Sequence, residues 1–210
     1  MKEIDMIFDR LDKLALFPGY QLERRVDIFF ALYLDRIINR RFHENITSKN
    51  IIPEFPLLKK QGKDGKQDYR PNRVDYAVFG MNYLYLIELK TSVGSRNKDQ
   101  DKVLSRAKGK DLPALIHEAF KIRDESGKTE KYDYFERCLN DIGIDHKALD
   151  EVIYGKEIKI VYIQPYERPS DKEQPYTIIT FEQIRTYIEQ EDDAIAKRFC
   201  KSLMEWKNRK

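Results

Sequence analysis

Two acidic residues and a lysine stand on neighbouring apolar segments of the sequence. Asp75 lies within RVDYAVF (73–79), and Glu88 and Lys90 lie within YLYLIELK (83–90). Both segments are rich in β-branched and aromatic residues, so we expect each to form a strand. Because side chains alternate along a strand, Glu88 and Lys90 extend the apolar face that the leucines begin. A fold gains no stability by directing charges to its core side, so this placement indicates either chemistry or a paired cluster.

A hairpin turning on residues 81–82 would bring the two carboxylates together. In that register Asp75 lies directly opposite Glu88, and Arg73 lies opposite Lys90. Two opposed carboxylates repel each other unless a cation separates them, and hard oxygen ligands of this kind suit magnesium or manganese. The alternative is a surface cluster in which Lys90 forms a salt bridge with Glu88. A register slip of one residue would separate the carboxylates.

The spacing of these residues resembles a known motif. Asp75, followed after twelve residues by Glu88-Leu89-Lys90, resembles the D-x(n)-E-x-K core of the PD-(D/E)xK nuclease superfamily. Upstream, the run GYQLER (19–24) is similar to the G-x-x-x-E-R element that opens the first core helix of Holliday-junction-resolvase-like members. The resemblance covers about residues 19–91 and extends more weakly to about 165.

Two departures from the family pattern stand in the sequence. Val74 occupies the position before Asp75 where many members have proline, which leaves the ligand itself unchanged. The Q-x-x-x-Y pattern of RecB-like members is not met, because Gln100 is followed at 104 by leucine.

The resemblance implies a restriction-endonuclease-like fold and a metal-dependent nuclease. Asp75 and Glu88 would hold Mg²⁺ or Mn²⁺, with the Leu89 carbonyl completing the sphere and Glu23 as a third carboxylate. Lys90 would orient the attacking water and stabilise charge on the phosphate. One or two ions would lower the pKa of that water for in-line attack on a phosphodiester, in DNA rather than RNA. Two further acids are held in reserve as carboxylates of the site: Glu54 and Asp68.

Two other functions are compatible with the same residues. The first is a non-catalytic nucleic-acid-binding module that retains the nuclease fold, which a missing third carboxylate would favour. The second is a protein-interaction domain, with the charged helical region 98–155 as its contact surface or a second copy as its partner. Salt-dependent binding to nucleic acid would separate the nuclease and the binding module from the protein-interaction domain.

The centre of the chain is more basic than the net charge of +3 indicates. Residues 57–110 hold thirteen Lys or Arg against six Asp or Glu, a local excess of seven positive charges. Such an excess is typical of a surface that contacts phosphates, although a solvated face gives the same composition. The candidates for phosphate contacts are Lys59, Lys60, Lys63, Lys66, Arg70, Arg73, Arg96, Lys98 and Lys102.

The elements that must position these residues follow from periodicity and capping signals. Expected helices cover about 2–16, 20–41, 98–108, 112–125 behind an Asp111 N-cap, 131–141, 146–154, 181–190 and 192–208. Expected strands cover 51–58, 73–79, 83–90, 159–164 and 176–180, the first at a sheet edge because of Pro53 and Pro56. Thr180 and Gln183 predict a capping box. The order predicts an α/β (α+β) fold with a mixed sheet flanked by helices.

The length predicts one domain over 1–210. Within it we expect an N-terminal helical extension (1–18), a core (19–180) with a helical insertion at about 98–155, and C-terminal helices (181–210). No run of eighteen apolar residues occurs, so no membrane span is expected. The acidic N-terminus is unlike a targeting signal, and Cys138 and Cys200 match no zinc or redox spacing. These features predict a cytoplasmic protein.

Overall fold

The computed structural model describes residues 2–59, 68–127, 129–146, 149 and 155–208. It is a mixed α/β structure, as the element order predicts. The helices are α1 (Lys2–Leu14), α2 (Glu23–Phe42), α3 (Lys98–Lys108), α4 (Leu112–Ser126), α5 (Thr129–Asp141), α6 (Phe181–Ile188) and α7 (Ala194–Lys207). The strands are β1 (Ile51–Leu57), β2 (Asn72–Phe79), β3 (Tyr83–Leu89), β4 (Glu157–Gln164) and β5 (Thr177–Thr180). The helix expected at 146–154 lies largely outside the described residues.

Hydrogen bonding orders the strands β1-β2-β3-β4-β5, so β1 with its two prolines is an edge strand as predicted. β1 and β3 both run antiparallel to β2. Along β3 and β4 the backbone N–H of Glu157 donates to the Asn82 carbonyl, and that of Lys90 donates to the Ile163 carbonyl. The two bonds advance in the same direction along both strands, so β4 runs parallel to β3 and the sheet is mixed.

The chain divides into two compact units made of interleaved segments. The first contains residues 1–44, 89–96 and 162–210, and the second contains 45–88 and 97–161. The boundary therefore passes through β3 and β4. The single domain with its extension, insertion and C-terminal helices stays a prediction.

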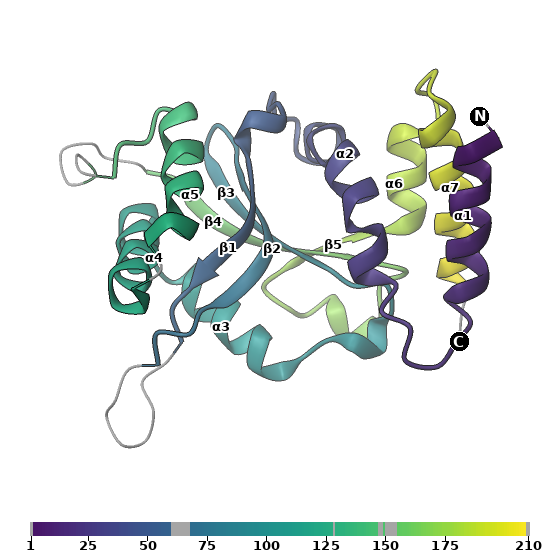
Figure 1. Cartoon of the computed structure of the whole chain (residues 1–210). Helices are drawn as coiled ribbons and strands as arrows, with labels where there is room; N and C mark the ends of the chain where they lie inside the picture. The colour runs from purple at the N-terminus through teal and green to yellow at the C-terminus, as the bar shows by residue number, and fades with distance from the viewer. Residues whose placement is uncertain (1, 60–67, 128, 147–148, 150–154, 209–210) are drawn as a thin grey trace. The chain divides into compact units, whose positions relative to one another are not determined.

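The first unit has an aromatic core beneath its terminal helices. Phe8 of α1 packs on Phe29 of α2 with ring centroids 4.4 Å apart, and Phe199 of α7 lies 6.2 Å from Phe8. At the surface of this contact Arg198 forms ion pairs with Asp9 at 2.7 Å and Asp12 at 2.9 Å. Helices α1 and α7 accordingly run side by side (Figure 1). The predicted N-terminal helix is thus packed on the last helix of the chain.

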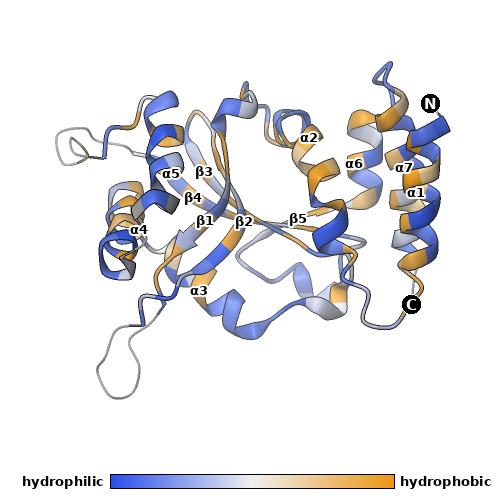
Figure 2. Cartoon of the chain, in the orientation of Figure 1, coloured by the Kyte–Doolittle hydropathy of each residue, from blue (hydrophilic) through white to orange (hydrophobic). Residues whose placement is uncertain are grey.

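The second unit joins the β1–β2–β3 meander to helices α3, α4 and α5. Helix α4 begins at the predicted Asp111 cap, whose Oδ1 accepts the Ala114 N–H at 2.8 Å. Its buried face includes Leu115, Ile116 and Ala119. Blue and orange residues interleave along α4 and α5 (Figure 2), which is the colouring of helices with one buried side. The buried apolar faces of these helices hold the strands of the second unit in place.

Candidate functional site

The register of β2 and β3 sets Asp75 opposite Glu88. The recorded partners run without a slip from Tyr76 with Ile87 to Phe79 with Leu84. Continued by one residue, the same register pairs position 75 with position 88, as the sequence predicts. Opposed residues of an antiparallel pair share a face, with Cβ atoms roughly 4.5–5.5 Å apart. The two carboxylates therefore belong to one face of the second unit.

This carboxylate pair is withdrawn from solvent to different degrees. Glu88 is 0% exposed, and Asp75 is partly buried. A buried carboxylate is costly unless cations or hydrogen-bond donors surround it. A second carboxylate on the opposite strand adds to that cost through like-charge repulsion.

Lys90 and Glu23 form an ion pair within the first unit. Lys90 Nζ lies 3.4 Å from Glu23 Oε1, and the lysine side chain is only 6% exposed. The backbone N–H of Lys90 donates to the Ile163 carbonyl at 2.8 Å, which fixes the chain as it leaves β3. Glu23 is the first residue of α2, where the helix dipole favours an acidic side chain. The structure thus pairs Lys90 with Glu23, and the salt bridge between Lys90 and Glu88 stays a prediction.

A glycine turn precedes α2. Gly19 has a φ of +75°, a conformation that glycine adopts without steric cost and other residues rarely adopt. Leu22 precedes the helix without any side-chain cap. The turn at Gly19 therefore sets the start of α2 and so the position of Glu23.

The donors at the carboxylate pair fit an oxygen-preferring ion. Asp75 and Glu88 supply carboxylate oxygens, and the Leu89 carbonyl follows directly in the chain. Magnesium is commonly bound by one or two carboxylates while it keeps several waters. Within the residues that the structure describes, however, no group of three or more His, Cys, Asp or Glu side chains is placed to hold a metal.

The two reserve carboxylates are engaged in ion pairs. Glu54 Oε2 lies 3.6 Å from Arg73 Nη1. Asp68 lies 3.3 Å from Lys59 Nζ and 3.0 Å from Arg70 Nε. Hydrogen bonds from Arg70 and then Lys59 lower the pKa of Asp68 below its usual range. Two cations thus share one carboxylate, and this cluster keeps a net positive charge.

The other predicted phosphate contacts differ in their accessibility. Lys98 is exposed, and Lys102 is exposed and paired with Asp99 at 2.8 Å. Lys60, Lys63 and Lys66 lie outside the described residues. Arg96 differs from the expectation of a surface contact, because its side chain is only 7% exposed and Nη1 lies 3.0 Å from Asp171 Oδ1.

Arg96 belongs to a buried polar cluster that sequence reasoning did not anticipate. Its guanidinium lies against the rings of both Tyr162 and Tyr176, 4.2 and 4.4 Å from their centroids. Asp171 Oδ1 also accepts hydrogen bonds from Arg168 and Tyr176, each at 3.0 Å. Arg96 is distant in the sequence from these partners and the cluster follows no period, so no local pattern predicts it.

No family model matches the chain, and neither a curated protein nor a solved structure is significantly similar to it. Among the described residues, no helix combines the length and the apolar character needed to cross a membrane.

Proposed function

We propose that this chain is a metal-dependent nuclease that hydrolyses phosphodiester bonds, in DNA rather than RNA. One observation carries the proposal: the β2–β3 register, extended by one residue beyond Tyr76 and Ile87, would set Asp75 opposite the buried Glu88. The ion pair between Lys90 and Glu23 supports it, because it orients the lysine of the motif. The fold assignment to a restriction-endonuclease-like core is part of the same proposal.

Each residue has a separate role in the proposed reaction. Asp75, Glu88 and the Leu89 carbonyl would hold Mg²⁺ or Mn²⁺, which supplies Lewis-acid stabilisation and lowers the pKa of water. Glu23 positions the Lys90 ammonium through their ion pair. Lys90 stabilises the negative charge that grows on the phosphate, an interaction that is worth most in a site shielded from water.

Basic side chains outside the carboxylate pair would position the substrate. Lys59 and Arg70 both form ion pairs with Asp68. Either side chain can therefore contact a phosphate while the other keeps its ion pair with Asp68. Phosphate contacts of this kind fix orientation and carry no sequence information. We therefore propose that sequence is not read by this basic surface.

A non-catalytic nucleic-acid-binding module is the second candidate. The observation that favours it is that, among the described residues, no group of three or more His, Cys, Asp or Glu side chains is placed to hold a metal. Such a module would bind nucleic acid with the same salt dependence and would not cut it.

Glu88→Gln tests the nuclease against the binding module. The substitution keeps the shape of a fully buried side chain and removes its charge. Cleavage of single-stranded, duplex and branched DNA with Mn²⁺ should fall by at least about 100-fold, the scale of losing one group aimed at transition-state charge. Glu157→Gln, at an exposed position at the start of β4, should cut as the wild type does. A wild-type protein that binds all these substrates and cuts none favours the module.

A further inference from the structure

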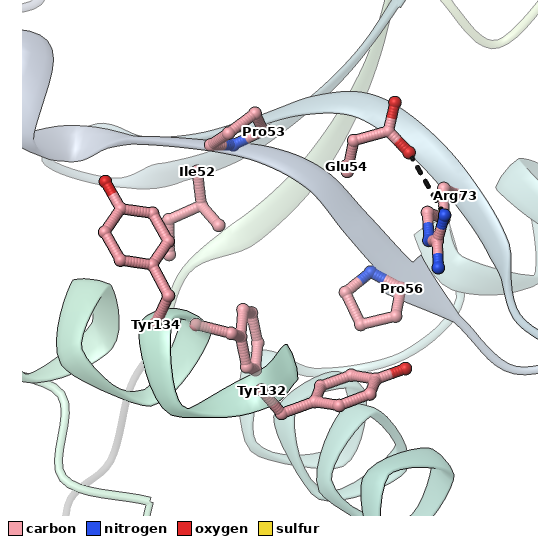
Figure 3. A pocket seen from close by; sticks show the side chains of 8 residues that line it. Ile52, Pro53, Glu54, Pro56, Arg73, Tyr132 and Tyr134 are labelled. Carbon is pink, nitrogen blue, oxygen red and sulfur yellow. Dashed lines mark ion pairs between the residues drawn. The ribbon is translucent and has the colours of Figure 1, made fainter. Parts of the chain in front are cut away.

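The second unit contains a cavity that the proposed reaction does not use. Its volume is about 380 Å³, within the range of roughly 300–1,000 Å³ that is usual for small-molecule sites. Strand β1 forms one side of the cavity and helix α5 the other (Figure 3). The residues that line its interior are Ile52, Pro53, Pro56, Tyr132, Tyr134 and Phe135.

The floor of this cavity is held in place by the core. Phe135 is 8% exposed, and its ring packs against Phe55 at 5.5 Å and Phe120 at 5.6 Å between centroids. Tyr132 meets Phe135 edge-on at 6.4 Å. Rings held on several sides lose little entropy when a ligand binds, so the cavity is preformed.

Tyr134 lines the solvent-accessible side of the cavity. Its side chain is 63% exposed, and its ring stands beside the strand residues Ile52 and Pro53 (Figure 3). The Arg137 guanidinium lies 5.6 Å from the ring centroid. An aromatic ring in this setting offers a flat, apolar face to a planar ligand, with positive charge nearby.

A weak ion pair stands at the mouth. Arg73 is 37% exposed and Glu54 is 66% exposed, with 3.6 Å between Nη1 and Oε2 (Figure 3). Exposed pairs of this kind contribute little stability, so Arg73 can exchange the carboxylate for a phosphate at small cost. Glu54 also has a φ of +52°, and such strain in a residue other than glycine concentrates at functional sites.

The mouth lies next to the carboxylate pair along β2. Arg73 and Asp75 are two residues apart, so they share a face and are separated by roughly 7 Å along the strand. Pro56 pairs with Arg73, which places this lining residue beside the arginine at the mouth. A ligand in the cavity with an anionic group at Arg73 would therefore continue toward Asp75.

We propose that this cavity binds one unstacked nucleobase of a single-stranded segment of the substrate, with its phosphate at Arg73. The link to cleavage rests on the proposed nuclease function. A flat apolar interior with a cation at its mouth matches a nucleotide, which joins a planar base to a phosphate. A proline-rich peptide would use the aromatic walls and leave the cation without a role.

The test is a binding titration without divalent metal, so that cleavage plays no part. The probe is a short single-stranded DNA with 2-aminopurine at one position, and a matched strand carries an abasic site there. Binding should quench the 2-aminopurine, and the abasic strand should bind less tightly. Tyr134→Ala should weaken binding by roughly 5- to 100-fold and remove the quenching, the range found when a stacking ring is lost. Tyr134→Phe should retain both, because stacking needs the ring and not the hydroxyl.

A tyrosine outside the cavity is the matched control. Tyr166, which is 42% exposed, should tolerate replacement by alanine with unchanged binding and quenching. Equal affinity of wild type and Tyr134→Ala, equal affinity for the abasic strand, or displacement of DNA by a proline-rich peptide alone would each overturn the base site. If the base binds but no substrate is cut, the nuclease function fails and the base site stands. If DNA is cut and Tyr134→Ala changes neither binding nor quenching, the nuclease function stands and the base site fails.

Discussion

Two regions of this molecule bury carboxylates, and the strand register distinguishes one from the other. Asp171 is 2% exposed, and donors surround it: Oδ1 faces Arg96, Arg168 and Tyr176, while Oδ2 faces Gln164. At the carboxylate pair, Glu88 is fully buried and the strand register sets a second acid, Asp75, opposite it. A carboxylate surrounded by donors stabilises the fold by itself. For the two opposed carboxylates, our proposal is that a cation from solution offsets their repulsion.

The titration of Asp171 reflects its surroundings. Burial alone would raise the pKa of this carboxyl. Hydrogen bonds from the Arg168 side chain and backbone, from Tyr176 and from Gln164 outweigh that effect and lower the pKa to about 2. The ionised form is therefore the one that the folded chain stabilises, which marks the cluster as a structural anchor for the segment after β4.

The largest effect on stability should come from removing that anchor. Asp171→Ala leaves the Arg96 guanidinium buried without its carboxylate, which should cost about 3–5 kcal/mol of unfolding free energy. Denaturant titration measures the loss, with the exposed Asp192→Ala as control. A loss of unfolding free energy below about 1 kcal/mol would contradict the role of Asp171 as a structural anchor.

Lys90→Ala should affect rate more than binding. In the proposed reaction its ammonium acts only when charge grows on the phosphate, so metal binding should persist while cleavage falls by roughly 100- to 1,000-fold. Single-turnover cleavage and a metal titration measure the two quantities separately. The exposed Lys197→Ala is the control. Equal loss of metal binding and rate would assign Lys90 to holding the carboxylates together.

Acid should weaken the Asp171 cluster in a defined window. The pKa is lowered on folding from 3.8 to about 2, so the stabilisation is complete above about pH 4 and is lost as pH falls toward 2. The difference corresponds to about 2 kcal/mol. Wild type should lose that much more stability than Asp171→Asn between pH 5 and pH 2. Parallel pH profiles for the two proteins would contradict the anchor.

The smallest effect concerns the basic segment after β1. Replacing Lys59, Lys60 and Lys63 together by alanine should reduce the slope of log affinity against log salt by up to about 2.7, at roughly 0.9 per lost phosphate contact. The fold should persist, because Arg70 still pairs with Asp68. Binding of duplex DNA across a salt series measures the slope. An unchanged slope would place the phosphate surface elsewhere.

Local rules predicted much of the fold because the signals are local. The capping box of Thr180 and Gln183 is present, with Gln183 N–H donating to Thr180 Oγ1 at 3.2 Å. The hairpin register followed from turn position and strand alternation, and it is confirmed at its recorded pairs. Periodicity and capping act within a few residues, so one sequence suffices to read them.

The polar contacts between distant segments could not be read in the same way. Arg96 forms a hydrogen bond with Asp171, 75 positions away in the sequence. Nothing in the local sequence distinguishes Arg96 from the exposed lysines nearby. The cavity likewise joins two prolines of an edge strand to tyrosines of a helix some eighty positions later. Lys90 and Glu23 were expected to share a site only through the family resemblance, and their direct ion pair adds a contact that the motif alone does not specify.

The most direct test of the carboxylate pair is the melting temperature of wild type and Asp75→Asn, each with and without Mn²⁺. Mn²⁺ should raise the wild-type melting temperature by mass action. Without metal, Asp75→Asn should melt at the same or a higher temperature, because one of two like charges is gone, and Mn²⁺ should then add little. A wild-type melting temperature that does not change with Mn²⁺ would contradict a metal site at Asp75 and Glu88. An equal rise for wild type and Asp75→Asn would contradict it as well.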